Sequence, residues 1–253
     1  MKILMGPLVA LVAILAIGSA QAAEITLVAP GGIRAALEQL LPVFEKKTGN
    51  KVTGTYLSGG KAKEAAVAGG VYDVPIVQPP LDSVLASGHV AAKSQTPLAT
   101  VWVGVAVRPG QKKPDISSAA AVKRMLLAAK SITYPSAANG AAAGVSFDAT
   151  MAKLGITEAM KPKIKIAPNG TEAMAMLARG EVEIGLTFIS EMAPGAGVVL
   201  VGPLPRDIST PTGFVAFVSA QSKQPKEAAA LIKFLASPAA KKIYKKSGMS
   251  PGK

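Results

Sequence analysis

Short apolar runs alternate with amphipathic stretches along almost the whole chain. The apolar runs are typical of strands and fall at residues 24–29, 51–57, 73–77, 100–107, 131–134, 163–167, 183–188, 198–204 and 213–220. Amphipathic stretches typical of helices fall between them, at residues 33–48, 61–67, 81–87, 119–130, 145–154, 172–181, 226–236 and 238–247. Strands that alternate with helices predict a parallel-rich α/β architecture. No linker rich in serine, glycine or proline divides the chain into independent halves.

Small residues occupy four of the predicted junctions between a strand and the following helix. These junctions are Gly31-Gly32, Ser58 to Gly60, Ala138 to Gly144, and Asn169 to Thr171. The start of a helix leaves backbone N–H groups free, and its partial positive charge favours an anion. Ligands of open α/β sheets bind outside the carboxyl ends of the strands. If the four junctions converge, they predict an anion-binding site.

The first 22 residues have the pattern of a secretory signal peptide. Lys2 is followed by an apolar run and then by Ala20-Gln21-Ala22, which fits the small-x-small cleavage site. The run is short for a membrane span, although an uncleaved anchor is the alternative. We expect cleavage after Ala22 and a periplasmic mature protein. The chain has no cysteine, so its stability must rest on the hydrophobic core without disulfides.

The chain is strongly basic, with a formal net charge of +13 and only 4% aromatic residues. A nucleic-acid surface would interleave basic residues with stacking aromatic residues, so we expect no nucleic-acid partner. The lysines fall in separate clusters near helix ends and loops, where they are typical of solvated faces. Their field would still steer a small anion toward the protein.

Residues 58–61 match the S-x-x-K pattern of penicillin-binding enzymes, and Lys47-Thr48-Gly49 supplies a K-T-G. In those enzymes K-T-G follows the serine, whereas here it precedes it, and S-D-N is missing. Gly49 also has a simpler role as the end of a helix. The single histidine, His89, has no neighbouring set of metal-ligating residues. We therefore expect no nucleophilic serine, no metal site and no cofactor.

Five segments in this order resemble the molybdate-binding proteins of ABC importers, which are two-lobed periplasmic solute-binding proteins of type II topology. They are ITLVAPGGIRAALEQLLPVFEKKTG, YLSGGKAKEAAVAGGVYDVPIV, ITYPSAANGAAAGVSF, AMLARGEVEIGLTF and AAALIKFLASPAAKKIYKKSGM. The resemblance implies an α/β fold with two lobes, each a mixed sheet flanked by helices. On that model residues 23–104 and 205–253 form one lobe and residues 105–204 the other. It also implies a monomer, a permease partner and closure of the lobes on a ligand.

The chain departs from this family where molybdate binders present hydroxyl groups. Gly32 and Gly59 align with serines, and Phe188 aligns with a tyrosine. A buried oxyanion loses about 1–3 kcal/mol for each missing donor, so we expect a different anion. Arg34 and Lys61 lie close after the missing serines and suggest a carboxylate, which arginine holds with two hydrogen bonds. The alternative is that both are solvated residues at helix starts.

The resemblance and the turns together define a candidate ligand-binding set. Its members are Gly31, Gly32, Ile33, Arg34, Ser58, Gly59, Gly60, Lys61, Asn139, Ala143, Asn169, Gly170, Thr171 and Phe188. The expected function is a receptor that binds a small carboxylate or oxyanion for an ABC importer. The alternative is an enzyme on the same fold, since aconitate isomerases resemble this family. Such an enzyme needs a positioned base, for which Lys61 and Glu191 are the candidates.

Overall fold

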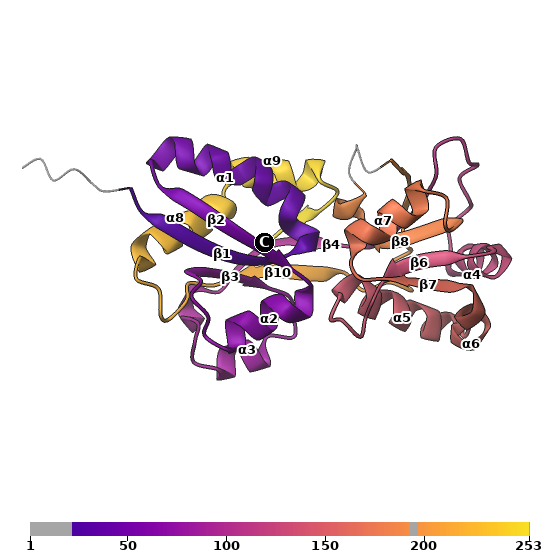
Figure 1. Ribbon diagram of the computed structural model, residues 1–253, viewed down its shortest axis with the longest axis horizontal. Helices are drawn as coiled ribbons and strands as arrows, with labels where there is room; N and C mark the ends of the chain where they lie inside the picture. Colours follow the sequence, from indigo (N-terminus) through magenta and orange to yellow (C-terminus); the bar gives the residue numbers. More distant parts are fainter. Residues whose placement is uncertain (1–21, 193–196, 253) are drawn as a thin grey trace, which may run out of the picture.

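A computed structural model describes residues 22–192 and 197–252, and the described residues form two β-sheets, each flanked by helices (Figure 1). The six-stranded sheet has the order β11-β4-β10-β3-β1-β2, and the five-stranded sheet has the order β7-β6-β8-β5-β9. We call each sheet with its helices a lobe, the first lobe holding the six-stranded sheet. The expected α/β fold with two mixed sheets is confirmed.

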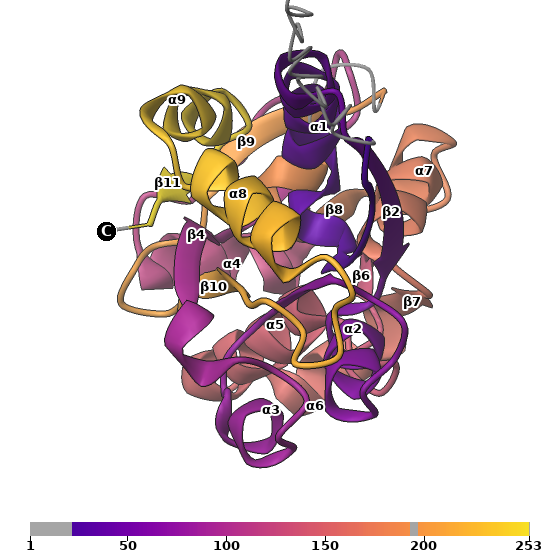
Figure 2. The same cartoon turned by 90° about the vertical axis from the view of Figure 1, so that its left-hand side faces the viewer.

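The first lobe combines the N-terminal third of the chain with its C-terminal end. Its strands are β1 (Glu24–Pro30), β2 (Lys51–Leu57), β3 (Val74–Val77), β4 (Thr96–Val101), β10 (Thr212–Ala216) and β11 (Ser250–Pro251). Its helices are α1 (Arg34–Thr48), α2 (Gly59–Val67), α3 (Asp82–Ala86), α8 (Pro225–Leu235) and α9 (Pro238–Lys246). Helices α1, α8 and α9 cover one face of the sheet, and α2 and α3 cover the other (Figure 2). Strand β1 runs parallel to β2 and β3, whereas β10 is antiparallel to β3 and β4.

The second lobe is built from the middle of the chain. Its strands are β5 (Val103–Val107), β6 (Ile132–Pro135), β7 (Ile164–Ala167), β8 (Ile184–Phe188) and β9 (Val199–Pro203). Its helices are α4 (Ala119–Ala128), α5 (Ala142–Leu154), α6 (Thr157–Met160) and α7 (Gly170–Ala178). The short 3-10 helices of the two lobes are η1 (Gly31–Ile33), η2 (Ala92–Ser94), η3 (Lys161–Lys163) and η4 (Ile189–Glu191). Strand β6 runs parallel to β7 and β8, and β5 is antiparallel to β8 and β9.

Helix α1 follows its amphipathic pattern. Its buried face consists of Ala36, Leu37, Leu40, Leu41 and Phe44. The ring of Phe44 packs on that of Phe234 from α8, with 5.5 Å between the centroids. Gly49 ends the helix with a positive φ of 78°, which glycine adopts without the steric cost of a side chain. Pro42 lies inside the helix, which continues beyond it to Thr48.

We predicted a single strand at residues 100–107. This prediction is wrong, because the apolar run divides into two strands at Trp102. Strand β4 ends at Val101 and pairs within the first sheet, whereas β5 begins at Val103 and pairs within the second. The chain therefore crosses between the sheets at Trp102, ahead of the boundary expected after residue 104. Arg206, on the returning crossing, places its guanidinium 5.3 Å from the centre of the Trp102 ring.

The predicted signal peptide, residues 1–22, lies almost entirely outside the described residues. Among the residues that the structure does describe, no helix combines the length and apolar character needed to span a membrane. Within the same residues no three histidine, aspartate or glutamate side chains gather as potential metal ligands.

Candidate functional site: a cavity between the lobes

A polar cavity with a volume of about 480 Å³ lies between the lobes. Its first-lobe lining is Pro30, Gly31, Gly32, Arg34, Tyr56, Leu57, Ser58, Gly59 and Gln78. Its second-lobe lining is Pro135, Ala141, Ala142, Ala143, Pro168, Asn169, Gly170, Thr171, Glu172, Phe188 and Glu191. These residues end or follow the parallel strands β1, β2, β3, β6, β7 and β8. The cavity therefore lies at the carboxyl ends of both parallel strand sets, where α/β proteins bind ligands.

Four helices begin at this cavity, and two of them begin without a side-chain cap. The Asn169 side chain accepts the N–H of Glu172 at 2.9 Å to cap α7, and Ser58 accepts the N–H of Lys61 at 3.4 Å in α2. Among the described residues no side chain caps η1, which leads into α1, or α5. The uncapped N–H groups near Gly31 and Ala142 therefore lack an intrahelical acceptor and favour an anion in the cavity.

At two glycines of these helix starts, a side chain of the cavity wall approaches the backbone closely. A Cβ on Gly59 would overlap the amide oxygen of Gln78. A Cβ on Gly170 would overlap the Glu191 carboxyl and would lie 2.5 Å from the Thr187 hydroxyl. Gly59 and Gly170 thus allow Gln78 and Glu191 to come against the backbone at the cavity wall.

Gln78 is a cavity residue that the sequence analysis missed. It follows β3 directly, its side chain is 3% exposed, and its Oε1 has no hydrogen-bond partner among the described residues. A carboxamide offers both N–H donors and an oxygen acceptor to a ligand. The available signal was its position, since a polar residue directly after the buried run VPIV lies at the carboxyl end of a strand.

Glu191 lies in η4, after β8, and its carboxyl group lines the second-lobe side of the cavity. Its Oε2 accepts a hydrogen bond of 2.6 Å from Thr187. Burial raises the pKa of the Glu191 carboxyl, and the hydrogen bonds from Thr187 and the Phe188 N–H oppose that rise. No arginine, lysine or histidine in the described part of the chain forms an ion pair with Glu191, so its charge is unbalanced when it ionises.

The two candidate cations are placed differently. Arg34 lines the cavity, bonds Glu38 at 2.7 Å and lies 5.2 Å from the centre of the Tyr56 ring. Lys61 is exposed and is not part of the cavity lining, because it lies further along the first turn of α2. Of the two predicted cations, the structure therefore places Arg34 at the cavity and Lys61 outside its lining.

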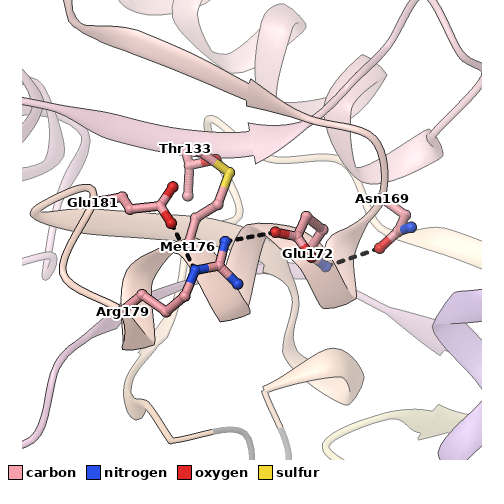
Figure 3. A network of polar contacts seen from close by, with 6 residues as sticks. All are labelled: Thr133, Asn169, Glu172, Met176, Arg179 and Glu181. Carbon is pink, nitrogen blue, oxygen red and sulfur yellow. Dashed lines mark hydrogen bonds and ion pairs between the residues drawn. The ribbon is translucent and has the colours of Figure 1, made fainter.

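The other carboxyl group of the lining, Glu172, is paired. Arg179 bonds Glu172 at 2.7 Å and Glu181 at 2.6 Å, and this network runs along the outer side of α7 (Figure 3). Thr133 of β6 contacts the Met176 sulfur at 3.8 Å and ties the same helix to its sheet. These contacts hold α7, and with it Asn169, Gly170 and the start of the helix, at the cavity.

The residues that replace the expected hydroxyl groups pack against one another. A Cβ on Gly32 would lie 2.8 Å from the Phe188 ring and 3.1 Å from the Phe214 ring. Phe188 is 3% exposed, and its centroid lies 6.4 Å from that of Phe214. The two aromatic rings therefore take the space that a side chain at position 32 would occupy.

Three other members of the candidate set lie outside the cavity lining, and each has a structural role. Ile33 is fully buried in the core. The Gly60 N–H donates to the Gly140 carbonyl at 2.8 Å, and the Ser58 hydroxyl donates to the Asn139 carbonyl at 2.9 Å. Gly60 and Asn139 therefore join the lobes beside the cavity. The Ser58 hydroxyl is engaged in this contact between the lobes.

Comparison with known proteins identifies the family of this chain. A model of the bacterial extracellular solute-binding proteins matches residues 25–250. The chain belongs to this family. It is 30% identical to an aconitate isomerase from Pseudomonas sp over 234 residues, which cover 90% of this chain and 87% of that protein. It is 28% identical to the molybdate-binding protein ModA of Azotobacter vinelandii over 236 residues, which cover 91% of each.

A solved structure agrees with this assignment. The periplasmic molybdate-binding protein of Azotobacter vinelandii superposes with a TM-score of 0.77 at 19% identity, covering 90% of this chain and all of that one. The expected resemblance to molybdate-binding proteins of type II topology is confirmed. Membership also places the chain among the extracellular solute-binding proteins of bacteria.

Proposed function

We propose that this protein binds a small carboxylate-bearing anion in the interlobe cavity and delivers it to an ABC permease. The observation that carries the proposal is the convergence of strand ends and helix starts from both lobes on one cavity. Backbone N–H groups at helix starts attract negative charge without a bulky cationic side chain. Arg34 adds a charged donor at the rim.

The lining favours a carboxylate over molybdate. Positions 32 and 188 carry no hydroxyl group, and the Ser58 hydroxyl already donates to Asn139. On the same measure one water molecule needs about 10–15 Å³, so a cavity of about 480 Å³ is large for one tetrahedral oxyanion. A di- or tricarboxylate fills more of this volume and gives Arg34 a planar group to hold with two hydrogen bonds.

A thermal-shift panel on the exported chain tests this proposal. The panel contains molybdate, tungstate, sulfate, phosphate, and mono-, di- and tricarboxylates including both aconitates. A ligand at a hundred times its dissociation constant stabilises the native state by about 2.7 kcal/mol. We expect a carboxylate to raise the melting temperature, and a response to molybdate and tungstate alone would contradict the proposal.

The setting of the receptor is part of the same proposal. Family membership and the signal-peptide pattern of residues 1–22 support a periplasmic, monomeric receptor with a permease partner. Mass spectrometry of the exported chain checks the predicted cleavage after Ala22. Deletion of the gene for the partner permease should abolish uptake of the anion while leaving its binding intact.

A second candidate function is isomerisation of a tricarboxylate, and Glu191 favours it. A proton shift between carbon atoms needs a base beside the bound acid, and a base works best when its pKa lies near the operating pH. Burial moves the pKa of Glu191 upward, in that direction. In this mechanism Arg34 and the helix starts hold the carboxylates, while Glu191 takes a proton from one carbon and returns it to another. The relative named aconitate isomerase supports the choice of substrate.

Turnover separates the two candidates. Each aconitate isomer is incubated with substoichiometric protein and followed by proton NMR. Many turnovers per protein, lost in Glu191→Gln, are expected of the isomerase, whereas tight binding without product is expected of the receptor. Persistent turnover in Glu191→Gln would exclude Glu191 as the base.

A further inference from the structure

Glu191 brings a hydrogen-bond acceptor that can carry a negative charge into a cavity whose helix starts otherwise favour anions. Its Oε2 is engaged by Thr187, and a Cβ on Gly31 would lie 3.7 Å from its Oε1. This distance places Oε1 beside the start of η1, on the far side from Gly170. Across the described residues, no side chain donates a hydrogen bond to Oε1. A carboxylate offers about four acceptor sites, so the hydrogen bonds from Thr187 and the Phe188 N–H leave Glu191 able to accept another from a ligand.

The groups around Glu191 leave its charge uncompensated. Helix η4 packs against η1, α7, β5 and β9, and strands β5 and β9 carry no titratable side chain. On α7, Glu172 is bonded to Arg179. At the start of α1, Arg34 is bonded to Glu38 and lies over Tyr56. Neither cation reaches Glu191, so an ionised carboxylate there repels an anion that has only acceptor atoms.

We propose that Glu191 makes the site selective for anions that present a hydrogen-bond donor, such as a hydroxyl group, beside their negative charge. This inference rests on the proposed anion-binding function and narrows its ligand class to hydroxycarboxylates and related acids. The ligand's carboxylate faces the helix starts, and its hydroxyl group donates to Oε1 of Glu191. An acceptor-only anion leaves two negative groups facing each other without a hydrogen between them.

Isothermal titration with matched anion pairs tests the inference at fixed pH. The pairs are malate and succinate, citrate and tricarballylate, and hydrogen phosphate and sulfate, each differing in the presence of a donor. We expect the donor-bearing member of at least one pair to bind at least tenfold more tightly. Glu191→Gln, whose amide both donates and accepts, should reduce that ratio below threefold. Glu158→Gln removes the same charge on the exposed α6 and should leave the ratio unchanged.

The pH dependence gives a readout that a purely structural role would not change. Binding of the acceptor-only member should weaken as pH rises, since Glu191 must hold a proton to face it. Above the pKa of Glu191 the loss approaches about tenfold per pH unit. The donor-bearing member should lose less affinity, and Glu191→Gln should remove the difference between the two slopes.

Two results would overturn the inference. The first result is that the two members of every pair bind with affinities within twofold of each other. The second is that the ratio of these affinities is unchanged in a folded Glu191→Gln protein. Either result would overturn the role of Glu191 while leaving anion binding intact. Failure of every anion to bind would overturn the proposed function as well, so the two failures are distinguishable.

Discussion

The two carboxyl groups at the cavity, Glu172 and Glu191, have opposite surroundings. Glu172 belongs to the first turn of α7, its side chain is 40% exposed, and Arg179 pairs with it. Glu191 lies deeper, is bonded by a neutral hydroxyl group and has no cationic partner among the described residues. The comparison teaches that presence in a cavity does not define a ligand-binding acid. The acid whose charge the protein leaves unbalanced is the one available to a ligand.

The largest effect on anion affinity is expected for Gly170→Ala, which should displace the Glu191 side chain. The added Cβ would overlap the Glu191 carboxyl, so either that side chain or the start of α7 must move. Overpacking of this kind typically costs about 1–3 kcal/mol of folding free energy. We expect anion affinity to fall more than tenfold, as measured by titration. Gly213→Ala is the matched control, because its Cβ would meet Pro79 at an ordinary 3.8 Å.

Removal of the cationic group at the rim should give the next largest effect. Arg34→Ala deletes the cationic side chain that lines the cavity and should weaken anion binding by about tenfold, or ~1.4 kcal/mol. Lys61→Ala removes the same charge from the start of α2, outside the cavity lining. The anion affinity of this variant should therefore stay within about twofold of the wild-type value. Equal losses in both variants, measured by titration at low and moderate salt, would show a long-range field in place of a contact.

The pH dependence of the unfolding free energy should reveal the burial of the Glu191 carboxyl group. The usual pKa of a glutamate is 4.5, and burial raises that of Glu191, so the folded state keeps a proton that the unfolded state has released. This contribution is present below pH 4.5 and is lost as pH rises through the higher folded-state pKa. Wild type should therefore lose stability relative to Glu191→Gln over that window, by about 1.4 kcal/mol for each unit of pKa difference. Chemical denaturation at several pH values measures it, and a parallel pH dependence in the two proteins would contradict the account.

The smallest effect is expected for Arg179→Ala, which frees Glu172. The released carboxyl group resembles Glu191 in lacking a cationic partner, but it stays exposed, so solvent screens it. We expect a loss of anion affinity below about twofold. A loss as large as that of Arg34→Ala would show that the network of Figure 3 positions the ligand site directly.

The sequence predicted the architecture because local periodicity determines it. Alternating strands and helices gave the α/β fold, and the small residues at Gly31, Gly59 and Gly170 marked the turns that line the cavity. The crossing at Trp102 was missed, since a continuous apolar run does not show where a chain leaves one sheet for the next.

Side-chain direction and depth were not accessible from the sequence. Arg34 and Lys61 looked equivalent, since each follows a glycine turn, yet only Arg34 belongs to the lining. Gln78 was missed because one glutamine after a strand carries no motif. Glu191 was only a weak candidate for a base, because its isolation from cations depends on contacts between distant segments.

The central claim is that the interlobe cavity binds a carboxylate-bearing anion. Its most direct test is isothermal titration of the wild-type protein with the most stabilising carboxylate of the panel and, separately, with molybdate. The account predicts saturable one-to-one binding of the carboxylate and no measurable heat of binding for molybdate at the same concentration. One-to-one binding of molybdate without binding of any carboxylate would contradict it.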